Sequence, residues 1–254
     1  MKMRFKVLLQ LLLLFGLNSV AKAQYAYTNS YGTWYYSIDN GTITITDYFG
    51  SVGAVTIPST ISNVPVTCIQ YNAINAFSTR TLISITIPKS VTSITRYALS
   101  GCNNLTAIYV DGLNPVYSDT DGILFNKSKT LLIQYPQAKG GSSYTIPNSV
   151  TNIGTDAFAY CSQLSKVTIP GSVTYIGVSA FNNAGLTNVT IPNSVLSISV
   201  GAFESCRSLT TATVGSGVTN IGAWAFENCT TLSRVYFNAD ILALILTARR
   251  SQVT

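Results

Sequence analysis

The sequence predicts a mainly β solenoid in which the short strands of successive coils stack in parallel. The first observation is a pattern that returns at a fixed period, with copies beginning 23, 22, 23 and 23 residues apart at Ile146, Ile169, Ile191, Val214 and Phe237. A fixed period of roughly 20 to 50 residues is the signature of a repeat architecture. The second observation is that β-branched apolar residues alternate with Ser, Thr and Asn in each copy, which is typical of strands with one buried face.

The copy from Ile146 to Thr168 shows what one coil contains. Leu164-x-x-Val167-x-Ile169 ends in period-2 alternation and predicts a strand, and a second short extended piece is expected at Val150–Ile153. The compact Ala157-Phe158 segment is too short for a full helix. The coil is therefore expected to consist mainly of strands and turns.

One coil buries too few apolar side chains to offset the ordering of its own backbone, so neighbouring coils must share a core. Stacked coils would hydrogen-bond to one another at about 4.8 Å spacing and bury each apolar position as a continuous row. We therefore expect the aromatic rings at one repeated position to line up, namely Phe158, Phe181, Phe203 and Phe226.

The repeated run Ile-Pro-x-Ser-Val-Thr-x-Ile-Gly-x-x-Ala-Phe-x-x-Cys-x-x-Leu-x-x-Val-Thr-Ile-Pro resembles the BspA-like class of leucine-rich repeat over roughly Ala54 to Phe237. This class is found mainly in bacterial surface and secreted proteins. The resemblance implies a curved leucine-rich-repeat solenoid with parallel strands, and it suggests protein binding or adhesion. It implies no catalytic residue.

The first 23 residues have the pattern of a secretory signal peptide. Basic residues precede the apolar run from Val7 to Leu17, and small residues at Ala21 and Ala23 favour cleavage before Gln24. The run is shorter than the roughly 18 residues of a membrane anchor, so a transmembrane segment is the weaker alternative. Removal of residues 1–23 leaves 11 basic and 9 acidic residues, so the formal charge of +6 gives no support for nucleic-acid binding.

Residues 24–53 lack the repeat and predict an N-terminal β cap. Two alternating segments, Trp34–Asp39 and Thr42–Asp47, flank Asn40-Gly41, which indicates a tight hairpin that covers the first coil. Its aromatic residues either pack under the cap or form a platform for sugar stacking; they are Tyr31, Trp34, Tyr35, Tyr36 and Tyr48.

Residues 54–237 form the predicted solenoid, with two irregular places. In the first repeat either Ala73-Ile74 or Ala76-Phe77 could fill the Ala-Phe position. Between about 111 and 143 an inserted hairpin is expected from Gly122–Phe125 and Thr130–Gln134. Insertions in repeats usually emerge as loops on one face and often serve binding, although a purely structural flap is as good an interpretation.

Residues 238–254 follow the last repeat as a C-terminal tail. A short capping helix starting at Asp240 over the last coil is expected, and a truncated or altered end is the alternative. The segment is too short to span a bilayer.

The chain contains no histidine, which excludes Ser-His and Cys-His catalytic pairs and histidine metal sites. Glu204 and Glu227 are one period apart and could form a glycosidase-like carboxylate pair, although two surface turns in register explain them better. Asp119 and Asp121 could contribute to a calcium loop, but a turn is favoured. We therefore expect a protein that is not an enzyme and has no cofactor or metal.

Four of the five cysteines share one phase of the coil, three residues before a leucine, so inward packing as small hydrophobes is favoured. They are Cys102, Cys161, Cys206 and Cys229. Only Cys206 and Cys229 lie on neighbouring coils, where a disulfide is the alternative. Cys68 is out of phase.

The remaining site candidate is the exposed side of the Leu-x-x-Val-x-Ile strands. Its outward positions form two rows, Ser84, Ala107, Lys166, Asn188, Thr211, Arg234 and Thr86, Tyr109, Thr168, Thr190, Thr213, Tyr236. From these rows we select as candidate partner-binding residues Tyr109, Lys166, Thr168, Asn188, Thr190, Thr211, Thr213, Arg234 and Tyr236. A solvated scaffold face rich in strand-forming threonine is the alternative.

The sequence thus favours a secreted or cell-surface bacterial protein that binds another protein or extracellular macromolecule, with no nucleic acid and no transmembrane segment after signal cleavage. Carbohydrate binding or hydrolysis, and a purely structural role in an envelope layer, are the competing interpretations.

Overall fold

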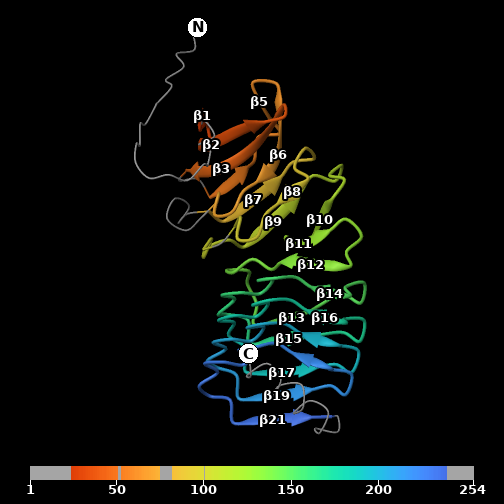
Figure 1. Ribbon diagram of the computed structural model, residues 1–254. Coiled ribbons are helices and arrows are strands. Elements are labelled where there is room, and N and C mark those ends of the chain that lie inside the picture. The colour runs from red at the N-terminus through yellow and green to blue at the C-terminus, as the bar shows by residue number, and fades with distance from the viewer. Residues whose placement is uncertain (1–23, 51–52, 75–81, 100, 239–254) are drawn as a thin grey trace, which may run out of the picture.

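The computed structural model describes residues 24–50, 53–74, 82–99 and 101–238. These residues form an elongated stack that runs from the N-terminal strands at one end to the last coil at the other (Figure 1). The described residues contain strands and turns and no helix. The expected signal peptide and the expected C-terminal helix lie outside the described residues.

The N-terminal cap is the predicted hairpin with one further strand. Strands β1 (Tyr25–Asn29), β2 (Gly32–Asp39) and β3 (Thr42–Phe49) pair antiparallel. Asn40 and Gly41 form the two-residue turn with φ values of 47° and 73°, as the Asn-Gly signal predicts. β3 then pairs in parallel with β6 (Val64–Ile69), so the cap continues directly into the solenoid.

The predicted long strands form one side of the solenoid. All of them pair in parallel, within three sheets. The first sheet contains β4 (Ala54–Thr56), β7 (Ser84–Ile87) and β9 (Ala107–Val110). The second contains β13 (Ser143–Thr145) and β15 (Lys166–Thr168), and the third contains β17 (Asn188–Ile191), β19 (Thr211–Val214) and β21 (Arg234–Phe237).

Short strands form a second side. Near the cap, β8 (Ser93–Ile94) pairs in parallel with β6, and β5 (Thr60–Ile61) pairs antiparallel with β6. Farther along, a parallel ladder contains β12 (Leu131–Gln134), β14 (Asn152–Ile153), β16 (Tyr175–Ile176), β18 (Ser197–Ile198) and β20 (Asn220–Ile221).

Turn segments that carry the Ala-Phe positions close each coil. Their backbone also bonds from coil to coil: the amide of Phe158 donates to the carbonyl of Ala180 at 2.7 Å, and the amide of Phe181 donates to that of Ala202 at 2.7 Å. In the first repeat Ala73 and Ile74 occupy this place, because both are fully buried and the Ile74 amide donates to the Ala98 carbonyl at 3.0 Å. The structure thereby resolves the register that the sequence left open.

The phenylalanine ladder confirms the predicted stacking. Phe158, Phe181, Phe203 and Phe226 form successive ring pairs with centroids 4.8, 4.9 and 5.1 Å apart and planes within 5° of parallel. Phe158, Phe181 and Phe203 are fully buried. Each ring thus packs on the same ring of the next coil, which makes the apolar interior continuous.

The inserted segment is built into the solenoid and does not project as a loop. The predicted hairpin is β11 (Ile123–Asn126) with β12, and an unpredicted strand, β10 (Tyr117–Thr120), pairs with β11. The turn between them is Asp121-Gly122, with φ values of 52° and 73°. Alternate side chains of β11 enter different cores, so the insertion separates an N-terminal from a C-terminal apolar cluster.

Candidate binding surface

The two outward rows lie in the predicted register on the long strands. In the C-terminal sheet Thr211 lies between Asn188 and Arg234 in one row. Lys166 pairs with Ser143 in the preceding sheet. These positions are exposed, apart from the half-buried Thr211. The period alone therefore places the first row of candidate residues correctly in space.

The second row has the same arrangement. Thr213 lies between Thr190 and Tyr236, and Thr168 pairs with Thr145 in the preceding sheet. Thr168, Thr190 and Tyr236 are exposed and Thr213 is half-buried, with 51% of Tyr236 accessible to solvent. The result is a wall of hydroxyl groups that ends in an exposed aromatic residue.

Tyr109 stands apart from the other candidates. It is 49% exposed on β9, but β9 pairs with β7 and not with the C-terminal strands. Beyond β9 the backbone amide of Ile108 donates instead to the carbonyl of Gly122, in the turn of the inserted strands, at 2.8 Å. The expected outward position of Ala107 is wrong: this residue is only 8% exposed, because the Gly122 turn lies against it.

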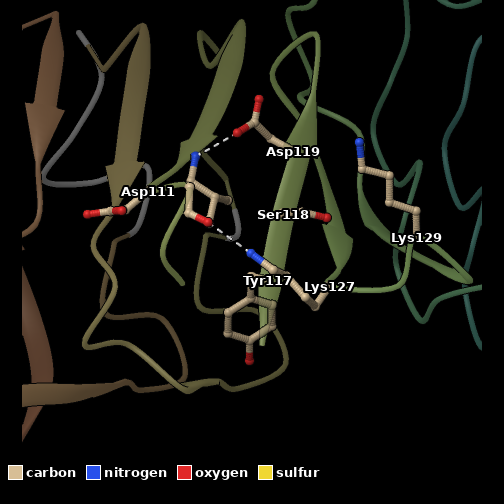
Figure 2. Close-up of a pocket in the computed structure, with 8 residues that line it drawn as sticks. Asp111, Tyr117, Ser118, Asp119, Lys127 and Lys129 are labelled. Carbon is tan, nitrogen blue, oxygen red and sulfur yellow. Dashed lines mark hydrogen bonds between the residues drawn. The ribbon is translucent and has the colours of Figure 1, made fainter. Parts of the chain in front are cut away.

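A shallow depression of about 320 Å³ lies between the end of β9, at Val110, and the inserted strands (Figure 2). Its charged groups are engaged with the backbone or neighbouring side chains. Asp119 accepts from the Val110 amide at 2.8 Å, Lys127 donates to the Gly112 carbonyl at 3.0 Å, and Lys129 donates to the Thr120 hydroxyl at 2.8 Å. These bonds hold the walls of the depression in place.

The hydrogen bond from the Val110 amide to Asp119 is also relevant to the calcium loop considered for Asp119 and Asp121. Asp119 and Asp121 belong to the β10–β11 turn region, Asp119 through its bond to Val110 and Asp121 through its left-handed backbone. Within the described ranges no three His, Cys, Asp or Glu side chains gather as a metal-binding group. The arrangement is that of a turn, as the sequence favoured.

Glu204 and Glu227 lie on adjacent turns of the third side, where the amide of Ser205 donates to the carbonyl of Glu227 at 2.7 Å. The carboxylate of Glu204 accepts from the side-chain amide of Asn182 at 3.1 Å, and Glu227 is exposed. Glu204 thus has a structural partner in the preceding coil.

The in-phase cysteines pack inward as expected, since Cys102, Cys161 and Cys206 are buried and Cys229 is half-buried, and all five cysteines are free thiols. The thiol of Cys206 donates to the carbonyl of Phe181 at 3.0 Å, and that of Cys229 donates to Phe203 at 3.1 Å. Burial raises the pKa of Cys161 to about 12. The interaction with the neighbouring Cys229 thiol, together with burial, raises the pKa of Cys206.

Three of the five aromatic residues singled out in the cap pack into the core, and the other two, Tyr31 and Tyr35, are half-buried. Trp34 and Tyr48 are fully buried with ring centroids 4.2 Å apart, and Tyr36 is 7% exposed. The Tyr48 hydroxyl donates to the Tyr31 carbonyl at 2.6 Å, and burial raises the pKa of Tyr48 to about 12. These rings fill the interior and offer no stacking platform to a sugar.

A second surface feature was not found from the sequence. Tyr71, Arg96, Tyr97, Asp156 and Tyr160 form a cluster on the turns that follow the short strands, and we call it the tyrosine patch. The available signal is Tyr160, which stands at a turn position where the later coils carry Asn183, Ser205 and Asn228.

Within the described residues no helix is both long and apolar enough to cross a membrane.

Comparison with known proteins agrees with this geometry. The pattern described as "BspA type Leucine rich repeat region" matches residues 23–118 and 137–246 in six copies. The unmatched stretch between the two ranges contains β11, β12 and part of β10, which form the insertion. A search of curated proteins finds no match.

Several solved structures are similar. A leucine-rich repeat protein from Eubacterium ventriosum has 23% identity and a TM-score of 0.52, with 84% of this chain and 85% of that chain covered, and it shows the same fold. A leucine rich cell surface protein from Faecalibacterium prausnitzii has 19% identity, a TM-score of 0.48 and coverage of 87% and 96%. The leucine rich repeat protein of T. pallidum has 26% identity, a TM-score of 0.47 and coverage of 86% and 92%. Because the repeat pattern matches well over half of the residues, the chain belongs to the BspA-type leucine-rich repeat family.

Proposed function

We propose that the protein binds an extracellular macromolecule, in the first place another protein, through the exposed face of β15, β17, β19 and β21. Leucine-rich repeat proteins generally bind proteins, and this family is generally non-catalytic. The observation that supports the proposal is the pair of outward rows, which stay in register along β17, β19 and β21, are matched on β13 and β15, and remain open to solvent apart from the half-buried Thr211 and Thr213. A regular, open sheet face offers many equivalent contacts to an extended partner surface.

The C-terminal end of the face contains the strongest anchors. Tyrosine and arginine are over-represented among residues that dominate binding energy, and Arg234 and Tyr236 are both exposed on β21. The charged candidates, Lys166 and Arg234, are both basic, while the other row positions on these strands are uncharged. The face therefore suits a partner whose complementary surface carries acidic groups around an uncharged centre.

Tyr109 lies on a different sheet from the other candidate residues. Because β9 does not continue into the C-terminal sheet, a partner that touches Tyr109 and Tyr236 together must extend past the inserted strands. We place the main contact on Lys166, Arg234 and Tyr236 with the threonines between them. Tyr109 is a secondary contact.

The proposed location is the cell surface or the external medium. The pattern of residues 1–23 favours secretion, and the match to the BspA-type leucine-rich repeat family is consistent with an extracytoplasmic location. We also propose that the protein acts without catalysis and without a cofactor, since the chain has no histidine and its stacked carboxylates are explained by surface turns.

The experiment compares the protein with the double variant Arg234→Ala/Tyr236→Ala on a panel of immobilised extracellular-matrix, serum and envelope proteins. The expected result is binding to at least one panel protein that falls about tenfold or more in the double variant, since each anchor contributes on the order of 1–2 kcal/mol. Tyr71→Ala is the matched control, because Tyr71 is as exposed as Tyr236 but lies on the turn side. Equal binding by the protein and the double variant would exclude this face.

A further inference from the structure

The tyrosine patch is organised around Tyr97. The ring of Tyr71 meets the Tyr97 ring edge-to-face, with centroids 5.6 Å apart and planes at 86°. The guanidinium carbon of Arg96 lies 4.3 Å from the centroid of the Tyr97 ring, and its Nε donates to Asp156 at 2.8 Å. The pKa of Tyr97 is raised, mainly by burial and then by nearby Asp156, with smaller contributions from Tyr71 and Tyr160. Direct contacts therefore join Tyr71, Tyr97, Arg96 and Asp156 into one group, although Arg96 and Asp156 are 60 positions apart in the chain. Tyr160 lies on the same turn segment as Asp156.

The patch is open to solvent on a different side from the long strands. Tyr71 and Tyr160 are 55% and 54% exposed, and 46% of the Arg96 side chain is accessible. Tyr71 follows β6 and Asp156 follows β14, so the group occupies the turns after the short strands. A ligand on this side would leave the outward rows free.

The backbone gives a reason to regard the tyrosines as selected for something other than folding. Tyr97 and Tyr160 have φ values of 60° and 61°, in the left-handed region that bulky residues rarely adopt. Asn183 and Asn228 occupy the place of Tyr160 in later coils with φ values of 55° and 57°, and asparagine tolerates this region much better. A tyrosine at this turn is therefore more strained than the asparagine that stands there in later coils.

The chemistry of the patch defines the ligand class. Arg96 and Asp156 neutralise each other, and tyrosine is uncharged at neutral pH, so the surface has no net charge and suits a neutral ligand. Arg96 directs two of its five N–H donors at Asp156, so most of the guanidinium donors remain available to a ligand. The Asp156 side chain is 17% accessible, so only part of its acceptor capacity faces the ligand. The flanking tyrosine rings offer flat apolar faces with little conformational entropy to lose.

We propose that the tyrosine patch binds a neutral glycan, with pyranose rings stacked on Tyr71 and Tyr160 and vicinal hydroxyls bonded to Arg96 and Asp156. A sugar hydroxyl both donates and accepts, so it satisfies the two polar groups together. A proline-rich peptide, the other ligand that aromatic surfaces bind, presents carbonyl acceptors and no prolyl N–H, and would leave the Asp156 carboxylate facing acceptors. The patch therefore favours the glycan.

The experiment measures binding of the full chain to an array of immobilised neutral polysaccharides (mannan, xylan, galactan and β-glucan). Tyr71→Ala and Tyr160→Asn are the test variants, and Tyr160→Asn is chosen because asparagine suits the turn and keeps the fold intact. Each variant is expected to lose about tenfold in affinity for the bound glycan, which corresponds to a stacking contact of about 1.4 kcal/mol. Tyr236→Ala, a tyrosine of similar exposure on the long-strand side, is expected to bind the glycan unchanged.

Three results would overturn the proposal. The first is no binding to any polysaccharide of the array. The second is glycan binding that survives in the Tyr71→Ala/Tyr160→Asn double variant. The third is binding of a polyproline peptide, lost in the same variants, without binding of any glycan. Because the control variant Tyr236→Ala tests the long-strand face separately, failure here is distinguishable from failure of the proposed protein-binding function.

Discussion

Phe181 stacks on Phe203 with ring centroids 4.9 Å apart and planes only 2° from parallel. These two residues are one repeat apart, and both are fully buried. Parallel rings at this spacing require the coils themselves to be stacked in register. The pair thus shows that residues one repeat apart in the sequence occupy equivalent positions on adjacent coils.

The first prediction concerns this ladder. Phe181→Ala is expected to reduce the free energy of unfolding by about 3–5 kcal/mol, because it opens a cavity between two coils. Phe226→Ala is the matched comparison and should cost clearly less, since Phe226 is only partly buried. Urea denaturation followed by circular dichroism measures both. Equal losses would contradict the continuous core.

The second prediction concerns Asn114, which is fully buried and forms hydrogen bonds through both its side-chain nitrogen and its side-chain oxygen. Its amide nitrogen donates to the carbonyls of Pro88 at 2.8 Å and Val91 at 2.9 Å, and its oxygen accepts from the amides of Val116 and Tyr117. Asn114 thereby ties the start of the insertion to the preceding coil.

Asn114→Asp replaces the two donors with an acceptor that faces two carbonyls. It should reduce the free energy of unfolding by about 2–4 kcal/mol, since a buried charge would be left facing unpaired acceptors. The exposed Asn103→Asp makes the same chemical change on the surface and is expected to stay within about 0.5 kcal/mol. A small effect at Asn114, comparable with that at Asn103, would show that these four bonds do not hold the insertion.

The third prediction uses the left-handed turn that Tyr160 and Asn183 share. Tyr160→Asn is expected to raise the free energy of unfolding by about 0.5–1 kcal/mol, and Asn183→Tyr should lower it by a similar amount. Thermal or urea denaturation of the two variants tests this directly. Changes of the same sign in both variants would mean that contacts of the side chain outweigh the backbone conformation.

Much of this fold follows from the sequence because the determining interactions are local or repeat exactly one coil away. Asn40-Gly41 specifies its hairpin through two positive φ angles, and the period places Thr213 between Thr190 and Tyr236. Strand β10 is not among the elements predicted from the sequence. Asp121-Gly122 has the same turn chemistry as Asn40-Gly41 and connects β10 to β11 as a second tight hairpin.

The rest depends on contacts that the period does not encode. Ala107 is covered by the Gly122 turn, and this contact arises only where the inserted strands meet β9. Arg96 and Asp156 are 60 positions apart, which is not a multiple of the repeat period, so their pairing cannot be predicted from the spacing. Deviations from the repeat therefore created the features that sequence reasoning missed.

The fourth prediction concerns alkaline pH. Burial raises the pKa of Tyr48 and of Cys161 to about 12 in the folded protein, above their ordinary values near 10 and 9. Between about pH 9 and 12 the unfolded chain releases these protons first, so it binds fewer protons than the native state and becomes favoured as pH rises. Stability should therefore be constant below about pH 9 and fall steadily above it. Urea midpoints measured from pH 7 to 11 test this.

Tyr48→Phe separates the ionisation of Tyr48 from general alkaline effects. It removes the ionisable hydroxyl and also the hydrogen bond to the Tyr31 carbonyl, so the variant should be about 1 kcal/mol less stable at pH 7. Its stability should then fall less steeply than that of the unchanged protein between pH 9 and 11, because one of the buried acids is gone. Parallel slopes in the two proteins would show that the Tyr48 hydroxyl does not contribute to the alkaline transition.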